Sequence, residues 1–348
     1  MKSGYKATSF DIAYKAGVSQ STVSRALRNS PLVSEKTRQK IQAIAKELNY
    51  TVDKHASSLR SQTSRTIALL LFEDPTSDES QINPFFMTML GSITRVSTER
   101  GYDLLVSFQR MDSDWHSDYK DSNKADGLIL LGYGDYVDYR DKLVQLHQQG
   151  THFVRWGAEV EGMNIATLGC DNMQGGYQVT QHLLADNRRH CAFIGTASHR
   201  APEFFDRYKG HCKALQEAGI EVSASMQKDA ISTEEAGFNA TAQLLASNQP
   251  VDAIFAASDL IAIGALRAIR ERGLRVPDDI AVAGFDDIAV AQFTRPSLTT
   301  AKQNTLLAGE MLVDNLIELI NGRPPETILL PSELVVRESS RTPASSQK

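Results

Sequence analysis

The sequence predicts an α/β protein in which a small three-helix headpiece precedes a two-lobed body of doubly wound parallel sheets. Its length of 348 residues exceeds what one hydrophobic core usually serves. Its N-terminal segment is basic and has helical periodicity, whereas the rest alternates apolar runs with helical patterns. We expect a headpiece at residues 1–52, a hinge helix and linker at 53–65, the body at 66–340 and a disordered tail at 341–348.

Charge is divided unevenly along the chain. Residues 1–65 contain 12 Lys and Arg against 4 Asp and Glu, a net charge of +8, while the other 283 residues contain 25 against 38, a net charge of −13. A basic segment joined to an acidic body is typical of a protein that binds a polyanion at one end, although a basic tail without a partner is an alternative. We expect no membrane segment and a cytoplasmic location, because no apolar run is long enough for a membrane helix or a signal peptide.

The first fifty residues predict three short helices around one core. Asp11 begins the first helix, and Gly17 follows where a helix commonly ends in the left-handed conformation. Ser19 is a good N-cap for the second helix, and Ser34 for the third. Apolar residues recur at helical spacing on one side of each helix. The predicted shared core consists of Ile12, Ala13, Ala16, Val23, Ala26, Leu27, Ile41, Ile44, Ala45 and Leu48.

The outer face of the second helix is polar and cationic. Two helices joined by a Gly-containing turn form a helix-turn-helix motif, whose second helix can enter the DNA major groove. There, Arg25 can bond guanine in bidentate fashion and Gln20 can read adenine. The hydroxyls of Ser19, Thr22 and Ser24 can take phosphates. Each of these residues alone is equally typical of a solvated surface, so the inference of DNA binding depends on the whole pattern.

Beyond Arg65, short apolar runs alternate with helical patterns. The runs span 67–72, 102–108, 127–131, 152–156, 190–194, 253–257 and 280–285, and the helical patterns include 137–149, 172–186, 233–247 and 261–272. Buried strands alternating with helices indicate parallel sheets covered on both faces, and about 280 residues suggest two lobes. Ligands of open sheets bind beyond the carboxyl ends of the strands, so we expect a site between the lobes.

Motifs of enzymes and metal sites are absent from this body. The sequence after its first strand, EDPTSDESQINPFF, lacks the glycines of a dinucleotide site, and there is no GxxxxGK[ST], HExxH or GxSxG. The eight histidines have no metal-ligand spacing, and Cys170, Cys191 and Cys212 form no CxxC pair. We therefore expect no catalytic residues, no metal and no cofactor, with the cysteines as packing residues. A metabolic enzyme of doubly wound fold is the alternative.

The sequence closely resembles the LacI/GalR family of bacterial transcription regulators. Its DNA-binding headpiece is matched by DIAYKAGVSQSTVSRALRNSPLVSEKTRQKIQAIAKELNY, followed by KHASSLRSQTSRTIALLL. The resemblance continues through NPFF at 83–86, CDNMQGG at 170–176, DRYKG at 206–210, ASDLIAIGALRAI at 257–269, GLRVPDDIAVAGFDD at 273–287 and PSLTTAKQN at 296–304. It implies a homodimeric regulator, most often a repressor, that binds a palindromic double-stranded operator and responds to a small effector held in an effector-binding and dimerisation domain.

The resemblance also assigns roles on DNA. Gln20, Ser21 and Arg25 stand where family members place their main base-reading side chains, but Arg28 replaces a frequent Asn, so the half-site cannot be copied from a relative. Residues 55–61 resemble the family's hinge helix, whose leucine, here Leu59, inserts into the minor groove; from the residues alone, Leu59 reads as a lone surface leucine. The expected DNA-binding residues are Thr8, Ser19, Gln20, Ser21, Thr22, Ser24, Arg25, Arg28, Tyr50, His55, Ala56, Leu59 and Arg60.

In this family, the body resembles a sugar-binding periplasmic protein that receives the effector between its lobes. The expected effector-binding residues are Phe85, Phe86, Trp156, Arg207, Ser258 and Asp286. Arg207 and Asp286 can each pair with vicinal hydroxyls and compensate one another's charge. Ordinary core packing is the alternative for the aromatic residues, and capping of the following helix or loop is the alternative for Asp286 and Asp259.

Arg155 bears on the identity of the effector. It stands where several family members have an aspartate that bonds the effector, so a cationic pocket wall for a phosphorylated or carboxylated sugar is one interpretation. An exposed arginine, or one that stabilises a lobe, is another, and a purine remains a weaker alternative to a sugar. The tail ESSRTPASSQK lacks the heptad leucines that join two dimers in one family member, so we expect a dimer.

Overall fold

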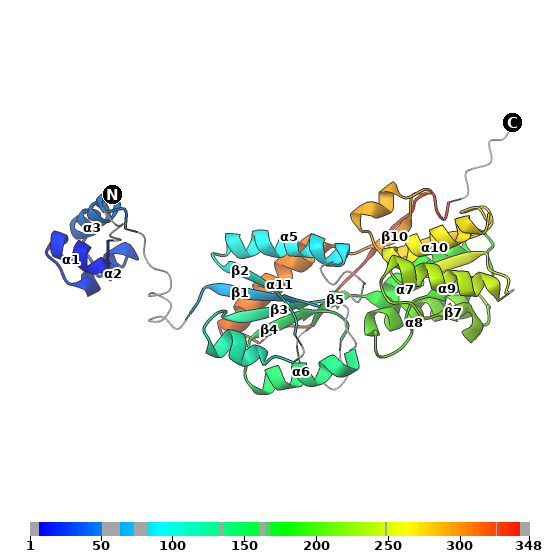
Figure 1. Cartoon of the computed structure of the whole chain (residues 1–348), viewed down its shortest axis with the longest axis horizontal. Coiled ribbons are helices and arrows are strands. Elements are labelled where there is room, and N and C mark those ends of the chain that lie inside the picture. Colours follow the sequence, from blue (N-terminus) through cyan, green and yellow to red (C-terminus); the bar gives the residue numbers. More distant parts are fainter. Residues whose placement is uncertain are drawn as a thin grey trace. The chain divides into compact units, whose positions relative to one another are not determined.

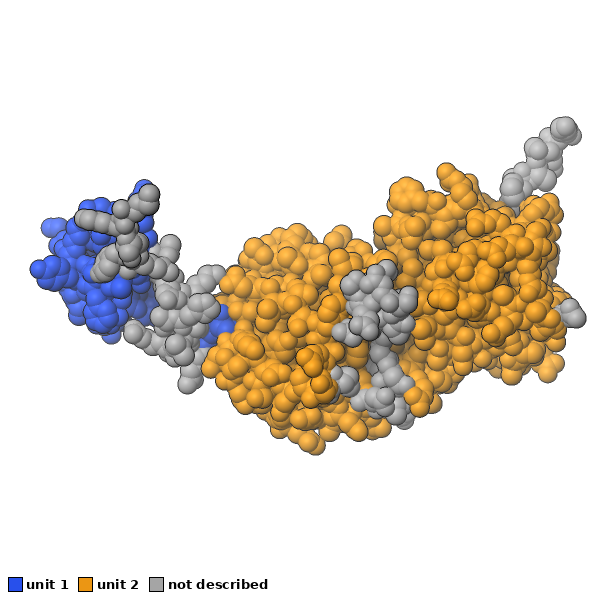
Figure 2. Space-filling model, in the orientation of Figure 1, with its two compact units in different colours: residues 1–64 blue, residues 65–348 orange. Residues whose placement is uncertain are grey.

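The computed structural model contains two compact units, residues 1–64 and 65–348 (Figure 2). The residues that it describes are 7–50, 63–72, 82–110, 112–132, 136–159, 165, 167–247, 249–324 and 326–341. The hinge helix expected at 55–61 lies outside the described residues, and so do His55, Ala56, Leu59 and Arg60. Of the expected tail, only Arg341 is described.

Within residues 7–50, the headpiece contains three helices: α1 (Ser9–Ala16), α2 (Gln20–Leu27) and α3 (Glu35–Glu47). Their predicted apolar stripes meet in one small core. The prediction that Asp11 begins α1 is wrong, because the helix starts two residues earlier. The amide and the hydroxyl of Thr8 both donate to Asp11 Oδ2, at 2.7 and 2.6 Å, so Asp11 closes the first turn from within the helix.

The other two helices begin where the sequence predicts. Ser19 Oγ accepts the amide of Thr22 at 3.2 Å, and Ser34 Oγ accepts the amide of Thr37 at 3.3 Å. Each of these bonds satisfies one of the backbone donors that a helix start leaves free. Gly17, between α1 and α2, has a φ of 69°, which is the left-handed conformation expected for it. This turn sets the direction in which α2 leaves α1.

The second unit contains two six-stranded sheets (Figure 1). We call each sheet, together with the helices that pack on it, a lobe. The first sheet has the order β11-β5-β4-β3-β1-β2 and the second the order β12-β10-β9-β8-β6-β7. All strand pairs are parallel except β10 with β12. The predicted α/β class, with a helix-turn-helix followed along the chain by parallel sheets, is confirmed.

Seven of the twelve described strands agree closely with the predicted apolar runs, and the other five were not predicted. In the first sheet they are β1 (Thr66–Leu71), β2 (Asp103–Phe108), β3 (Gly127–Leu131), β4 (Phe153–Trp156), β5 (Thr167–Cys170) and β11 (Ile328–Leu330). In the second they are β6 (Cys191–Ile194), β7 (Gln227–Lys228), β8 (Ala253–Ala256), β9 (Ala281–Asp286), β10 (Thr299–Lys302) and β12 (Glu333–Val335).

Helices cover both faces of the first sheet. On one face lie α5 (Pro84–Glu99) and α11 (Thr305–Ile320), which pack on each other, and on the other lies α6 (Tyr136–Gln148). Alternate residues of β1 enter different cores: Leu69 faces α5, whereas Leu70 faces the α6 side. Burial on both faces explains why β1 is apolar throughout rather than alternating.

The second lobe contains two pairs of packed helices. They are α7 (Asn172–Leu184) with α8 (Pro202–Glu217), and α9 (Glu234–Ala246) with α10 (Asp259–Glu271). The chain passes between the two sheets three times, after β5, after β10 and after β11. Each lobe is therefore assembled from distant parts of the sequence. No described helix is both long enough and apolar enough to cross a membrane.

Replacement of Gly17 by Ala should destabilise the headpiece by about 1–2 kcal/mol, the cost of a left-handed L-residue. A Cβ at this position would meet no atom within 4 Å, so the cost comes from the backbone alone. Thermal unfolding of the headpiece followed by circular dichroism would measure it. Gly17→Asn should lose clearly less, because asparagine tolerates this conformation, and equal losses for the two variants would contradict the explanation.

Candidate DNA-binding surface and effector site

On the exposed face of α2, some side chains are hydrogen-bonded within the headpiece and others are not. Ser19 is held in its cap, with its hydroxyl 2.8 Å from those of Ser21 and Thr22. Gln20 Nε2 donates to Ser9 Oγ at 3.0 Å, which ties α2 to α1. Arg25 is exposed, and its guanidinium makes no hydrogen bond or ion pair within the described residues. Arg25 is thus the cation on this face that is ready to contact another molecule.

Three other predicted DNA contacts have structural partners in the headpiece. Arg28 donates from Nε to the Ser24 carbonyl at 3.2 Å and from Nη2 to the Ser24 hydroxyl at 3.0 Å. Thr8 caps α1, and Tyr50 packs against the small core. The structure therefore brings the described members of the predicted set together on one small domain, where Arg28, Thr8 and Tyr50 are engaged within the headpiece.

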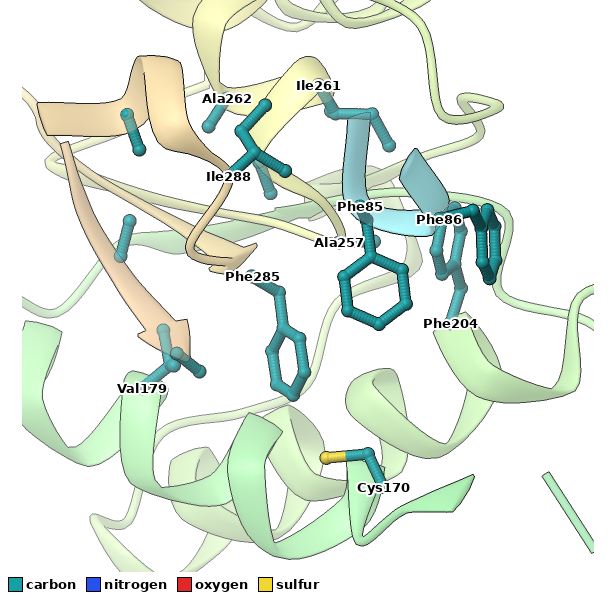
Figure 3. Close-up of a cluster of buried hydrophobic side chains, with 14 of the residues drawn as sticks. Phe85, Phe86, Cys170, Val179, Phe204, Ala257, Ile261, Ala262, Phe285 and Ile288 are labelled. Carbon is teal, nitrogen blue, oxygen red and sulfur yellow. The ribbon is translucent and has the colours of Figure 1, made fainter. Parts of the chain in front are cut away.

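Aromatic side chains gather where the two lobes meet (Figure 3). Phe85 and Phe86 lie in the first turn of α5, with ring centroids 5.1 Å apart, and Trp156 ends β4 with its centroid 6.5 Å from that of Phe85. Phe204 in α8 and Phe285 in β9 complete the group from the second lobe. All five are buried, so the alternative of core packing describes their present contacts.

Arg207 is the centre of the polar part of this region. It lies in α8 and is only 1% exposed. Its Nε donates to Asn172 Oδ1 at 2.8 Å, and its Nη1 donates to the carbonyl of Ala257. Its Nη2 lies 3.6 Å from Asp286 Oδ1, and the guanidinium lies 3.8 Å from the centroid of the Phe285 ring. A planar cation with this many partners is fixed in one orientation.

Asp286 has an unusual backbone conformation, and its side chain is hydrogen-bonded. It ends β9 with a φ of 114°, a conformation that side-chain-bearing residues rarely adopt. Its Oδ1 accepts Gln303 Nε2 at 2.7 Å. The neighbouring carboxyl of Asp259 accepts the Thr300 hydroxyl at 2.5 Å and the Ile288 amide at 2.9 Å, which fixes the loop after β9. Asp259 thus supports the loop that presents Asp286.

Ser258 takes part in a hydrogen-bond chain that crosses between the lobes. Asn83, at the start of α5, donates from Nδ2 to the Ser232 hydroxyl at 3.2 Å, and that hydroxyl donates to Ser258 Oγ at 2.9 Å. A second crossing lies elsewhere, where the Glu203 carboxylate in α8 accepts the amide of Ala158 at 3.0 Å. These two contacts join the lobes in the region where the aromatic residues are buried.

Arg155 is buried, so the interpretation of an exposed arginine is wrong. The alternation of a strand places it on the opposite face of β4 from Trp156. Its Nη2 donates to the carbonyl of Ala158 and to the hydroxyl of Thr167, the latter at 3.0 Å. Its Nη1 and Glu203 Oε1 would lie 2.9 and 2.8 Å from a Cβ at Gly157, so both groups border that glycine.

Four polar residues of this region were not predicted as site residues from the sequence. Asn83, Asn172, Glu203 and Gln303 all contact predicted residues or join the lobes. Three of them occur in segments that signalled the family, NPFF, CDNMQGG and PSLTTAKQN. Their position directly after a strand or at a helix start was the available signal.

Models of two known protein families match the chain. Residues 10–53 match the model described as bacterial regulatory proteins, lacI family. Residues 180–340 match the model described as a periplasmic binding protein-like domain. The two matches fall on the headpiece and, for the most part, on the second lobe.

Characterised relatives match nearly the whole chain. The transcriptional regulator CelR of Thermobifida fusca is 32% identical over 335 residues, which are 94% of this chain and 96% of that protein. The transcriptional repressor PurR of Histophilus somni, strain 129Pt, is 29% identical over 342 residues, 97% of this chain and 99% of that protein.

Solved structures are similar along the same length. The structure of a CelR–cellobiose complex superposes with a TM-score of 0.72 at 30% identity, and covers 96% of this chain and 100% of its own. The Lac repressor dimer bound to operator and the anti-inducer ONPF superposes with a TM-score of 0.80 at 27% identity, and covers 97% of this chain and 100% of its own.

Burial, together with the nearby charge of Asp286, raises the pKa of Asp259 well above its usual value. The folded chain then holds a proton that the unfolded chain releases, so this group's contribution to stability is complete below the usual pKa and is lost as the pH rises toward the raised one. Asp259→Asn cannot titrate and should flatten the decline, by about 1.4 kcal/mol for each unit of the difference. Urea unfolding from mildly acidic to neutral pH would show it.

A matched control for this prediction is Asp279→Asn. Asp279 is an exposed carboxylate whose pKa is lowered by its hydrogen bonds from Arg275, so its removal should not flatten the same decline. If the parent and Asp259→Asn lose stability equally with rising pH, Asp259 does not titrate as described.

Proposed function

The chain belongs to the LacI family of bacterial transcription regulators, and on that premise we propose that it is a homodimeric repressor whose operator affinity is controlled by a sugar or a related small metabolite. Its relatives are regulators and not enzymes, which decides against the metabolic alternative. The observation that carries the proposal is the buried polar cluster around Arg207, which lies beside aromatic rings between the lobes.

The chemistry of this cluster suits a polyhydroxylated ring. Arg207 offers a planar set of donors and Asp286 offers acceptors, so vicinal hydroxyls can replace their present partners. The two charges offset one another, and Arg155 is already engaged with the Ala158 carbonyl and the Thr167 hydroxyl, which favours an uncharged ligand. Phe85 and Trp156 offer ring faces, and Phe86 and Ser258 complete the proposed site. The relative with cellobiose in its structure supports a sugar.

The headpiece supplies the DNA contacts of the proposal. We assign base reading to Gln20, Ser21 and Arg25 of α2, which would enter the major groove. We assign phosphate contacts to the hydroxyl-bearing residues Thr8, Ser19, Thr22, Ser24 and Tyr50, with Arg28 nearby. The hinge residues His55, Ala56, Leu59 and Arg60 would contact the minor groove. Two headpieces on one palindrome require a dimer, as in the operator-bound Lac repressor structure.

A titration of the protein onto selected operator DNA tests the proposal. The operator would be obtained by selection from random duplexes, and its affinity compared with and without cellobiose, glucose and hypoxanthine. A change caused by a sugar alone supports the proposal, and a change caused only by hypoxanthine would establish a purine-responsive regulator instead, the alternative that the PurR relative favours. Failure to select any sequence would contradict DNA recognition.

Arg25→Ala should cost about 1–3 kcal/mol of specific binding, which is the discrimination of one bidentate base contact. The loss should appear on the operator but not on random DNA, because non-specific binding comes from the summed charge. Fluorescence anisotropy on both duplexes at one salt concentration would measure it. Arg28→Ala is the matched control, since Arg28 is bonded to Ser24, and it should lose less. Equal losses on operator and random DNA would refute base reading by Arg25.

Arg207→Lys should weaken the effector's influence on operator binding at least tenfold in effector concentration, while the free protein still binds operator. Lysine keeps the charge but cannot form the paired hydrogen bonds of the guanidinium. The control is Arg267→Lys on α10, which is partly exposed and pairs with Glu234. An unchanged effector midpoint for Arg207→Lys would remove this residue from the site.

A further inference from the structure

A second cavity of about 350 Å³ opens in the second lobe, at the opposite edge of the sheet from the effector site. Its lining includes His190 and Cys191 at the start of β6 and Gln227 at the start of β7. The proposed effector residues lie instead at the carboxyl ends of strands, such as Asp286 at the end of β9. The cavity is therefore a separate feature, and its volume is that of a small-molecule site.

The interior of this cavity is apolar and its mouth is polar. Leu215, Ile220 and Met226 line it together with the rings of Tyr208 and His211. Arg189 and Glu221 also line it; both are exposed and of opposite charge, so the site has no net charge from them. About half of the lining residues are polar and most of these are exposed, so an uncharged ligand can pack on the apolar interior and reach polar groups as well.

His211 contributes a defined hydrogen-bonding group to this cavity. It is 2% exposed, and its ring lies beside those of Phe193, Tyr208 and Phe255. Its Nδ1 is 2.9 Å from the hydroxyl of Thr180, which itself donates to the carbonyl of Gly176 at 2.9 Å. A hydroxyl has one proton, so both contacts are satisfied only when His211 carries its proton on Nδ1 and donates it to Thr180.

The other ring nitrogen of His211 is then an acceptor. Burial lowers the pKa of His211 to about 3, so the ring is neutral at physiological pH and Nε2 keeps its lone pair. No donor bonds Nε2 within the described residues. Nε2 is not fully enclosed by protein atoms, so a hydroxyl or N–H group of a molecule bound in the cavity can donate to it.

From these observations we propose that the cavity is a second small-molecule site, which binds an uncharged ring compound through a hydroxyl or N–H donor to His211 Nε2. The ring of the ligand packs against the apolar interior, and its donor reaches His211 at the buried end. His211 lies one turn of α8 after Arg207, but the proposal does not depend on the function assigned to the effector site.

Phenol is the probe, because it combines an uncharged ring with one hydroxyl donor. In the full-length protein, ¹⁵N NMR of the histidine rings should show His211 protonated on Nδ1, and phenol should shift its Nε2 resonance. Toluene has a similar ring and no donor, so it should bind at least tenfold more weakly. His211→Phe keeps the aromatic ring and removes the acceptor, so it should lose the preference for phenol over toluene.

Two further variants complete the test. Val222→Trp fills the cavity from a partly exposed position that needs no repacking of the core, and it should abolish phenol binding. Arg207→Lys changes the effector site and should leave phenol binding unchanged. The proposal is overturned if phenol leaves the Nε2 resonance unmoved at millimolar concentration, if phenol and toluene bind equally, or if Val222→Trp binds phenol like the parent.

Discussion

A guanidinium removed from water must find its hydrogen-bond partners within the protein, and the region between the lobes is organised around this requirement of Arg207. An uncompensated buried charge is far more costly than a single lost hydrogen bond. Three chain segments meet the requirement: Asn172 at the start of α7, Ala257 after β8 and Asp286 at the end of β9. Because parallel strands end at one edge of a sheet, Ala257 and Asp286 converge without any long loop, and Asn172 joins them from the start of α7, which follows β5 of the first sheet.

The same arrangement would allow a ligand to replace some of the hydrogen bonds in this region. In the proposed effector site, ligand hydroxyls would replace the neutral partners Asn172, the Ala257 carbonyl and Gln303, so the charges of Arg207 and Asp286 would still offset one another. The contacts from Asn83 to Ser232 and from Glu203 to Ala158 join the two lobes. A ligand that strengthens or breaks these contacts changes the relative stability of lobe arrangements, which is the physical requirement for control at a distance.

The sequence predicted the strands whose burial produces a continuous run of apolar residues. The runs that became β1 and β3 are apolar throughout because both of their faces are covered. The strands β5 and β10, with the sequences TLGC and TTAK, were not among the predicted runs, since they are short and owe their burial to neighbouring strands. The packing of α11 on α5, more than 200 residues earlier, has no local signal at all.

The residues of the candidate sites likewise include some that local sequence predicts and others that only the fold identifies. The cap of Ser19 and the turn at Gly17 follow from local backbone chemistry and were predicted. The amides of Asn172 and Gln303 acquire their roles only when the fold brings them to Arg207 and Asp286, so residue type alone could not identify them. Arg155 is an intermediate case, because the period of two along β4 already separated it from Trp156.

The central claim is that one chain links DNA recognition by its headpiece to ligand occupancy of the second unit. Linkage requires reciprocity: a compound that weakens operator binding by some factor must itself bind more weakly, by the same factor, when operator is present. Isothermal titration of the sugar into the protein, free and saturated with operator, measures this directly. The expected result is a sugar affinity that changes on the operator complex by the same factor, and in the same direction, as the sugar changes operator affinity. Identical sugar affinity in both titrations would contradict it.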